Sequence, residues 1–229
     1  MSNGERKVAV FRAIDDAAGT QAALAARGID AVLAPVTEIV ALAASSPMGP
    51  FDFVVATSAR AFATPLAWAK LPLFVVGEKT AEAARRAGFS PTPPADDIVS
   101  LIPRLPAGRA LYLAGRDRKP ELEAALAGRI AVQVRYEARA RGGWTEAEAQ
   151  AVAGAFAALH YSPRAAALAE AFATAGGVGP AFLRLAHVCL SREVAAPLAR
   201  AGAGRVIWPQ RPAEEPLLDA LESALADRL

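Results

Sequence analysis

The chain has 229 residues, of which 54% are hydrophobic and 21% charged, and its formal net charge at pH 7 is +2. This composition supports a packed core and argues against a disordered chain. The near-balanced charge and the lack of a basic run interleaved with aromatics argue against nucleic acid as a partner, although arginines can still meet an anionic small molecule locally.

Neither a secretory leader nor a membrane span is predicted. Residues 1–7 lead directly into an apolar strand, without the apolar segment of a signal peptide. The longest apolar stretches, such as 39–44, fall far short of the roughly 20 residues that span a bilayer. Cys189 is the single cysteine, which excludes an intrachain disulfide and is typical of a reducing compartment. We therefore expect a cytoplasmic protein, and the charge balance favours a monomer.

The first half of the sequence alternates between short apolar strands and alanine-rich helices. Strands are expected at 8–11, 31–36, 38–42, 51–56, 73–76 and 110–113. Asp15 or Asp16 can cap the first helix, which Gly28 can end in the left-handed conformation. Further helices are expected from about 59, shortened by Pro65; at 78–87; and at 98–102, capped by Asp96 or Asp97.

The second half begins with a helix at 120–126 and a strand at 130–136. That strand is expected to place Ile130, Val132 and Val134 on one face and to expose Arg135 on the other. The charged, glycine-bearing stretch 139–143 is typical of a linker. A capping box at 145–148 predicts a helix to about 157. The chain is expected to end with a strand at 205–208, a proline loop at 209–212 and a helix at 214–226.

Two stretches of the sequence occur twice. Residues 54–61 (VVATSARA) match 158–165 (ALHYSPRA), and residues 73–81 (LFVVGEKTA) match 187–195 (HVCLSREVA). Each copy is an apolar strand, a turn of small hydroxyl and cationic residues, and an alanine-rich helix that ends at glycine. The repeats predict two similar α/β domains with parallel sheets, and such units invite a ligand cleft lined by the turns at their strand ends.

The order of the elements predicts that the N-terminal strand joins the C-terminal sheet. One strand–helix pair precedes the first repeat unit, whereas the second unit runs to the C-terminus. We therefore expect a discontinuous α/β domain of residues 1–34 and 140–229, an inserted α/β domain of residues 41–130, and two linker strands at 35–40 and 131–139.

The candidate binding residues lie in the repeated turns. Thr57, Ser58 and Arg60 follow the strand of the first unit, and Ser162 and Arg164 follow the matching strand of the second. The start of a helix offers free N–H groups and a partial positive charge, which attract a carboxylate or a phosphate. The alternative is that both serines only cap their helices. The same pattern in both halves favours an anion site.

Further candidates lie beside these turns. Gly77, Lys79 and Thr80 follow the next strand of the first unit, and Ser191 and Arg192 follow the matching strand of the second. Arg12, just beyond the first strand, can add another cation; the alternative is an ordinary surface charge.

Signatures of other chemistries are missing from the sequence. It contains no G-x-G-x-x-G, no Walker loop and no G-x-S-x-G, and no cluster of histidine, cysteine or carboxylate has metal-ligand spacing. The glycines within 176–179 follow a helix and are interpreted as a flexible loop. His160 and His187 lie in apolar strands and are interpreted as core residues. Cys189 is interpreted as a buried thiol that is not a nucleophile.

Over nearly its full length the chain resembles the uroporphyrinogen-III synthase family. The resemblance rests on the order and spacing of Arg12 after the first strand, 56–61 (ATSARA), 76–81 (VGEKTA), 134–136 (VRY), 161–165 (YSPRA), 191–195 (SREVA), and the final proline loop and helix. It implies two α/β domains joined by a two-stranded link, the first of them discontinuous. It also implies a reaction without cofactor or metal, in which hydroxymethylbilane loses water and closes with inversion of its last ring to give uroporphyrinogen III.

The resemblance also implies roles for single residues. Tyr136 matches the family's tyrosine on the linking strand, a candidate for assisting loss of the hydroxyl group; the alternative is a packed linker aromatic. Thr80 matches a family threonine at the cleft. Ser58 and Ser162 match the serines of the two strand-end turns.

The sequence departs from the family at residues 191–194, where members often carry glycine and threonines. Ser191 and Arg192 can substitute for those contacts. The departure leaves a second function open, that of a non-catalytic two-domain protein that binds an anionic small molecule or a tetrapyrrole. A nucleotide-dependent group-transfer enzyme is disfavoured because the sequence has no phosphate loop.

Overall fold

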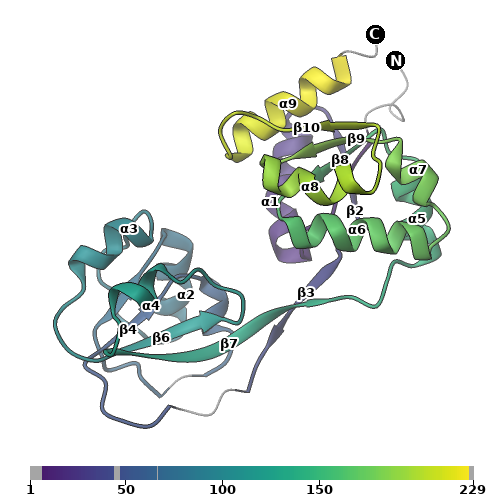
Figure 1. Cartoon of the computed structure of the whole chain (residues 1–229). Coiled ribbons are helices and arrows are strands. Elements are labelled where there is room, and N and C mark those ends of the chain that lie inside the picture. The colour runs from purple at the N-terminus through teal and green to yellow at the C-terminus, as the bar shows by residue number, and fades with distance from the viewer. Residues whose placement is uncertain (1–6, 44–46, 66, 227–229) are drawn as a thin grey trace. The chain divides into compact units, whose positions relative to one another are not determined.

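The computed structural model describes residues 7–43, 47–65 and 67–226 (Figure 1). They form a mixed α/β fold with two five-stranded sheets. The chain divides into two compact units, one of Met1–Glu38 with Arg139–Leu229 and the other of Ile39–Ala138. Each sheet belongs mainly to one unit, and the two divisions of the chain fall inside strands β3 (Thr37–Ala41) and β7 (Ile130–Ala140).

The first unit holds the sheet ordered β10-β9-β8-β1-β2. Its strands are β1 (Lys7–Val10), β2 (Asp30–Leu33), β8 (Ala157–His160), β9 (Ala186–Cys189) and β10 (Arg205–Ile207). Its helices are α1 (Ile14–Ala26), α5 (Glu146–Ala153), α6 (Pro163–Ala175), α7 (Gly179–Leu183), α8 (Arg192–Arg200) and α9 (Glu214–Ala226). The N-terminal strand β1 lies between β2 and β8 and runs parallel to both, as the order of the elements predicted.

The second unit holds the sheet ordered β3-β7-β6-β4-β5. Besides β3 and β7, its strands are β4 (Phe53–Ala56), β5 (Leu73–Val75) and β6 (Ala110–Gly115). Its helices are α2 (Glu78–Arg86), α3 (Ile98–Leu101) and α4 (Glu121–Ala125), with the 3₁₀ turns η1 (Ala59–Phe62) and η2 (Ile102–Arg104). Strand β4 runs parallel to β5 and to β6, and β6 runs parallel to β7.

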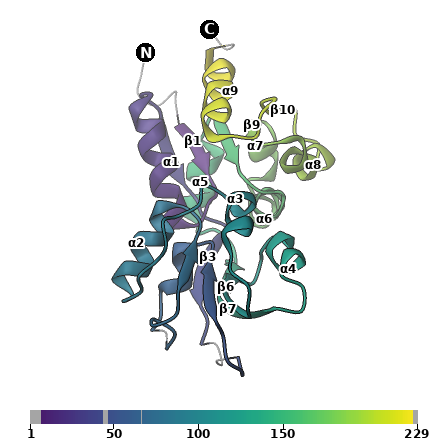
Figure 2. The ribbon, with the colours of Figure 1, turned by 90° about the vertical axis from the view of Figure 1, so that its left-hand side faces the viewer.

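Both sheets bury apolar side chains on two faces, because their strands are joined by helices that cover each face. In the first unit α1 and α9 cover one face, and α5, α6, α7 and α8 cover the other (Figure 1). In the second unit α2 and η1 pack against one face, and α3 and α4 against the other (Figure 2). The carboxyl ends of neighbouring parallel strands therefore share one edge of each sheet, and the candidate residues follow these ends.

Several helix ends differ from the prediction. Neither Asp15 nor Asp16 caps α1, which begins after Ala13 without a side-chain cap, although Gly28 does take the left-handed conformation at φ 68°. The capping box is confirmed, since Thr145 accepts from the Glu148 N–H and Glu148 accepts from the Thr145 N–H. Helix α5, however, ends at Ala153, because 157–160 enter the sheet as β8.

The segments 139–143 and 176–179, expected as a linker and a loop, are irregular except at one end of each. Arg139 and Ala140 belong to β7, and Gly179 starts helix α7 instead of lying in a loop.

The prediction for Arg135 was wrong. Its side chain is buried, with 5% of its surface exposed, whereas Ile130, Val132 and Val134 are only half-buried. A guanidinium is buried only when hydrogen bonds replace its water, and main-chain carbonyl groups supply them here.

Within the described residues, no helix has the length and apolar character needed to cross a membrane.

Candidate functional site

In the second unit the candidate residues lie along the edge formed by the carboxyl ends of the strands. The strand order β7-β6-β4-β5 places Tyr136 first, then the end of β6, then the turn of Thr57 and Ser58 after β4, and finally Gly77 after β5. The candidate residues predicted from the sequence belong to three of these four neighbouring strands. None of them lies in β6.

The turn after β4 is closed by its own serine. The Ser58 hydroxyl oxygen accepts from the Arg60 N–H at 3.3 Å, so Ser58 caps η1. The helix that follows has only four residues, which leaves little helix dipole at this turn. Capping uses a lone pair of the serine oxygen and leaves its O–H as a donor. Ser58 therefore caps η1 and retains a hydroxyl hydrogen that can donate, and the Arg60 side chain lies beside it in sequence.

The turn after β5 starts a longer helix. Gly77 has φ 77°, a conformation that side chains other than glycine rarely adopt, and its carbonyl accepts from the N–H groups of Thr80 and Ala81. The Lys79 side chain is exposed in the first turn of α2. The Thr80 side chain is 5% exposed and faces the interior. Of these two candidates, Lys79 is the one that a dissolved anion can reach in this conformation.

Tyr112 of β6 contacts Thr57, and Tyr136 of β7 lies opposite Gly115 at the end of β6. The hydroxyl groups of Thr57 and Tyr112 are 2.9 Å apart and hydrogen-bonded. Burial raises the pKa of Tyr112, and the nearby phenol of Tyr136 acts in the same direction, so Tyr112 stays protonated. Tyr136 is half-buried, with its carbonyl oxygen accepting from the Arg116 N–H at 2.9 Å. Tyr112 was missed in the sequence; the available signal was a tyrosine in an otherwise apolar strand, whose hydroxyl needs a partner when buried.

In the first unit the matching turns also follow the carboxyl ends of neighbouring strands. Ser162 caps α6 by accepting from the Ala165 N–H at 3.1 Å, and Ser191 caps α8 by accepting from the Val194 N–H at 3.4 Å. These helices have 13 and 9 residues, long enough for a helix dipole to favour an anion at their start. The side chains of Arg164 and Arg192 are exposed beside the two caps. The altered turn at 191–194 thus keeps a cap and a cation.

Arg12 is not an ordinary surface charge. Its guanidinium lies 4.2 Å from the ring centroid of Tyr161, donates to the Thr20 hydroxyl at 3.2 Å, and is 3.6 Å from a carboxylate oxygen of Glu214. The Tyr161 hydroxyl donates to the same oxygen at 3.1 Å. Thr20 and Glu214 were missed because they come from α1 and α9, far from any motif. Arg12 is therefore already paired with a carboxylate from the last helix.

The three core residues singled out in the sequence are buried as predicted. His160 and His187 are hydrogen-bonded to each other at 3.0 Å in the interior, and Cys189 is fully buried. Among the described residues, no group of three or more potential ligands is arranged to hold a metal ion.

Cys189 is expected to be unreactive in the native protein. Burial raises the pKa of its thiol to about 12, so almost no thiolate is present at neutral pH. With an aromatic disulfide reagent we expect no release of the coloured thiol from native protein and one equivalent after denaturation, since the chain has one cysteine. Rapid native-state labelling that abolishes activity would contradict the buried-thiol interpretation.

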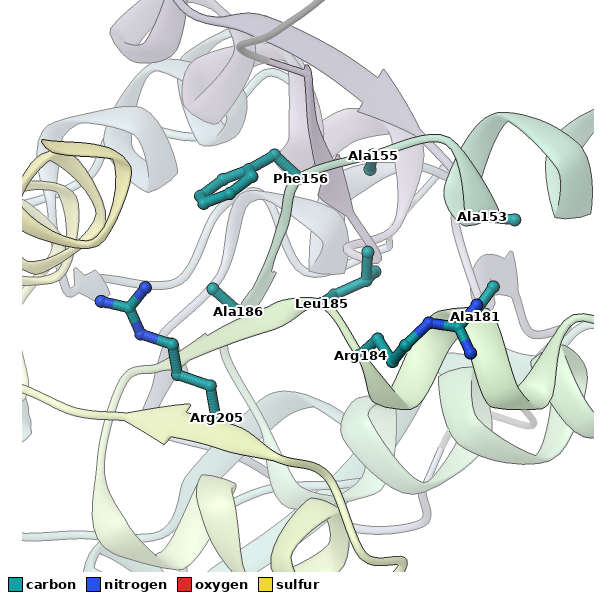
Figure 3. Close-up of a pocket in the computed structure, with 8 residues that line it drawn as sticks. All are labelled: Ala153, Ala155, Phe156, Ala181, Arg184, Leu185, Ala186 and Arg205. Atoms are coloured by element: carbon teal, nitrogen blue, oxygen red, sulfur yellow. The ribbon is translucent and has the colours of Figure 1, made fainter. Parts of the chain in front are cut away.

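A cavity of about 440 Å³ lies in the first unit, near the amino ends of β8, β9 and β10 (Figure 3). It is lined by Phe156, Leu185, Arg184, Arg205 and four alanines. Figure 3 shows the two arginine side chains extending in opposite directions, so they do not converge on one anion. None of the candidate residues lines this cavity, which lies at the opposite edge of the sheet from them.

Parallel sheets with polar residues after successive strands are typical of α/β proteins that bind ligands at the carboxyl ends of their strands. The model of one family, described as uroporphyrinogen-III synthase HemD, matches residues 18–219. The chain therefore belongs to the uroporphyrinogen-III synthase family, whose members are cyclising hydro-lyases of tetrapyrrole biosynthesis. The family match supports the enzyme and not the non-catalytic binding protein.

Solved structures share the fold. A uroporphyrinogen-III synthetase from Helicobacter pylori is 15% identical, with a TM-score of 0.59, over 95% of this chain and 99% of its own. A mutant uroporphyrinogen III synthase from the extremely thermophilic bacterium Thermus thermophilus is 19% identical, with a TM-score of 0.50, over 96% of this chain and 99% of its own. No curated protein matches the chain.

Proposed function

We propose that this chain converts hydroxymethylbilane into uroporphyrinogen III by way of the residues at its strand ends. The observation that carries the proposal is the family match over residues 18–219. The terminal hydroxyl leaves as water, and the substituted carbon of the last ring attacks the resulting cation. The spiro intermediate then rearranges as the ring closes. These steps are redox-neutral, and we propose that they need neither cofactor nor metal.

Tyr136 is the proposed catalytic residue. Departure of hydroxide is unfavourable, and a phenol that donates a proton or hydrogen bond to the leaving oxygen lowers that barrier. The half-buried setting of Tyr136 near Tyr112 supports this role, because a partly desolvated donor interacts more strongly with a developing anion.

The strand-end cations are the proposed substrate-binding groups. Substrate carboxylates are bound by the basic side chains and by the hydroxyl and amide donors of the capped turns. The proposed set is Arg12, Thr57, Ser58, Arg60, Gly77, Lys79, Thr80, Ser162, Arg164, Ser191 and Arg192. Arg12 is paired with Glu214 through one terminal nitrogen, so a substrate carboxylate would bind Arg12 through its other N–H groups or replace that partner.

The domains are proposed to correspond to the two compact units. The division at Glu38/Ile39 and Ala138/Arg139 lies within a few residues of the boundaries expected from the sequence, and β3 and β7 are the proposed linker strands. We further propose a monomer that works in the cytoplasm.

The function is tested by supplying fresh hydroxymethylbilane to the purified chain with EDTA and no added cofactor. The oxidised products are then resolved by isomer. Predominantly type III product is the expected result, whereas spontaneous closure gives type I. An isomer ratio equal to that of the protein-free control would refute the proposal, and binding of a carboxylated tetrapyrrole without turnover would revive the non-catalytic alternative.

A further inference from the structure

We propose that Arg135 and Gly115 are positioning residues that fix the Tyr136 phenol at the strand edge. The proposal rests on the role of Tyr136 proposed above. It is carried by three observations within the second unit: a bulge in the pairing of β6 with β7, a buried guanidinium at that bulge, and a close approach of the phenol to a glycine.

The bulge comes immediately before Tyr136. Strands β6 and β7 pair in register as far as Ala114 with Val134, after which Gly115 lies opposite Tyr136. One residue of β6 therefore faces two of β7, and Arg135 is the extra residue. A bulge bends its strand and redirects the side chains that follow, and bulges are common beside active sites. This bulge moves Tyr136 by one position relative to the end of β6.

Arg135 connects the bulge to the segment that follows the Thr57–Ser58 turn. Its guanidinium donates to the carbonyl oxygens of Ala61 at 3.2 Å, Thr64 at 2.7 Å and Pro65 at 3.3 Å, and to the Thr64 hydroxyl. These acceptors are the end of η1 and the chain directly after it. The planar guanidinium has several donors in fixed directions, so it specifies the path of this backbone more closely than an ammonium group can.

The buried guanidinium thus holds two parts of the candidate site together. One is the turn that carries Thr57, Ser58 and Arg60, and the other is the strand that carries Tyr136. With 5% of Arg135 exposed, water does not compete strongly for these hydrogen bonds.

Because Gly115 has no side chain, the phenol of Tyr136 can occupy the space beside it. A Cβ atom at Gly115 would lie 2.8 Å from Cζ and 2.9 Å from the hydroxyl oxygen of Tyr136, closer than carbon atoms approach in proteins. The φ of Gly115 is not in the left-handed region, so alanine is excluded by the phenol alone and not by the backbone. Gly115→Ala must therefore move the Tyr136 side chain or its strand.

The first experiment measures the phenol directly. The chain has three tyrosines, so protein labelled with 3-fluorotyrosine should give three ¹⁹F resonances, and the one lost in Tyr136→Phe belongs to Tyr136. We expect this resonance to shift or broaden in Gly115→Ala, Arg135→Met and Arg135→Lys. A Tyr136 resonance that stays in place in folded Gly115→Ala and Arg135→Lys overturns the proposal.

The matched controls change similar residues that do not touch Tyr136. Gly142→Ala adds a methyl group where no atom lies within 4 Å, at a glycine with ordinary φ. Arg129→Met removes a guanidinium that donates to the Gly108 carbonyl at 2.8 Å, directly before the start of β7. Both controls are expected to leave the Tyr136 resonance where it is. Arg129→Met tests for a general disturbance of the second unit, whereas Gly142→Ala lies in the first unit and tests for a disturbance of the whole chain. Either control moving the resonance as far as Gly115→Ala would overturn the proposal.

The second experiment links position to rate. A reacting group displaced by about 1 Å can cost about 100-fold in rate, so we expect Gly115→Ala to lower kcat by about 10- to 100-fold with KM nearly unchanged. Arg135→Lys in a Tyr136→Phe background should cause no further loss of kcat, because it acts through the phenol. Equal losses in both backgrounds would overturn the positioning role. If the resonance moves but kcat does not, Arg135 and Gly115 still position the phenol and the proposed role of Tyr136 fails instead.

Discussion

Tyr136→Phe is expected to lower kcat for type III closure by about 10²- to 10⁴-fold, the range that a positioned proton donor contributes. The substitution keeps the ring that packs at Gly115 and removes only the hydroxyl group. We therefore expect KM to change by less than about twofold, since the donor acts on the leaving oxygen and not on the substrate carboxylates. The measurement is steady-state kinetics with isomer-resolved products, corrected for the uncatalysed type I background.

Tyr112→Phe is the informative comparison, because it removes another phenolic hydroxyl from the same edge of the same sheet. Tyr112 is 4% exposed and bonds to Thr57, so its loss should disturb the site indirectly and cost less than the loss at position 136. Equal losses of kcat in the two variants would mean that the hydroxyl of Tyr136 has no special role. Unchanged turnover in Tyr136→Phe would return Tyr136 to the alternative of a packed aromatic.

Local sequence signals predicted the strands, the turns and the shared strand edges. The duplicated strand–turn–helix units, the capping box at Thr145 and the glycine at position 28 all depend on contacts within a few residues. For the same reason the repeat identified Ser58 and Ser162 together. Both cap the helix that follows, which was the alternative that the sequence left open, and their role toward substrate is still a prediction.

Contacts between distant segments could not be predicted from these signals. Arg135 occupies the polar position of an alternating strand, and only the fold brings the carbonyl groups of 61–65 to it. The pairing of Arg12 with Glu214 joins the first strand end to the last helix, about 200 residues along the chain. Likewise, the bulge before Tyr136 exists only in the pairing of β6 with β7. The sequence therefore named residues on the edge but not what holds them in position.

Acid is expected to destabilise the first unit well before it affects the second. The chain has two histidines, His160 and His187, and both are buried in the first unit. His187 Nε2 lies 3.0 Å from the Phe182 carbonyl and must donate to it, so Nδ1 accepts from His160 Nε2–H. That tautomer leaves His160 Nδ1 as a buried acceptor that has no hydrogen-bond partner among the described residues. A proton added to His160 Nδ1 would place a positive charge among the rings of Phe11, Phe182 and His187.

The pKa values give the direction of the effect. Burial lowers the pKa of His187 to about 4, and burial together with the neighbouring His187 lowers the pKa of His160 well below its ordinary value. In the unfolded chain the pKa values of both histidines return to roughly 6.5. At pH values between the folded-state and unfolded-state pKa, the unfolded state therefore binds more protons than the folded state. Stability is therefore complete above about pH 6.5 and is lost as the pH falls. From pH 7 to pH 5 the lowered pKa of His187 should cost about 2 kcal/mol of unfolding free energy, and the lowered pKa of His160 acts in the same direction.

Hydrogen exchange measured by mass spectrometry can follow the two units separately. After correction for intrinsic exchange rates, protection in β8 and β9 should fall by at least about 2 kcal/mol between pH 7 and pH 5, while protection in β4 and β6 should hold within about 0.5 kcal/mol. His187→Gln retains a donor for the Phe182 carbonyl and removes one titrating group, so the loss of protection in β8 and β9 should become smaller. An equal fall in both units would trace the acid sensitivity to groups other than the histidine pair. An ordinary domain is stable by only about 5–15 kcal/mol, so a loss of the expected size is a substantial share of that stability. The stability of the first unit would then depend on both histidines staying neutral.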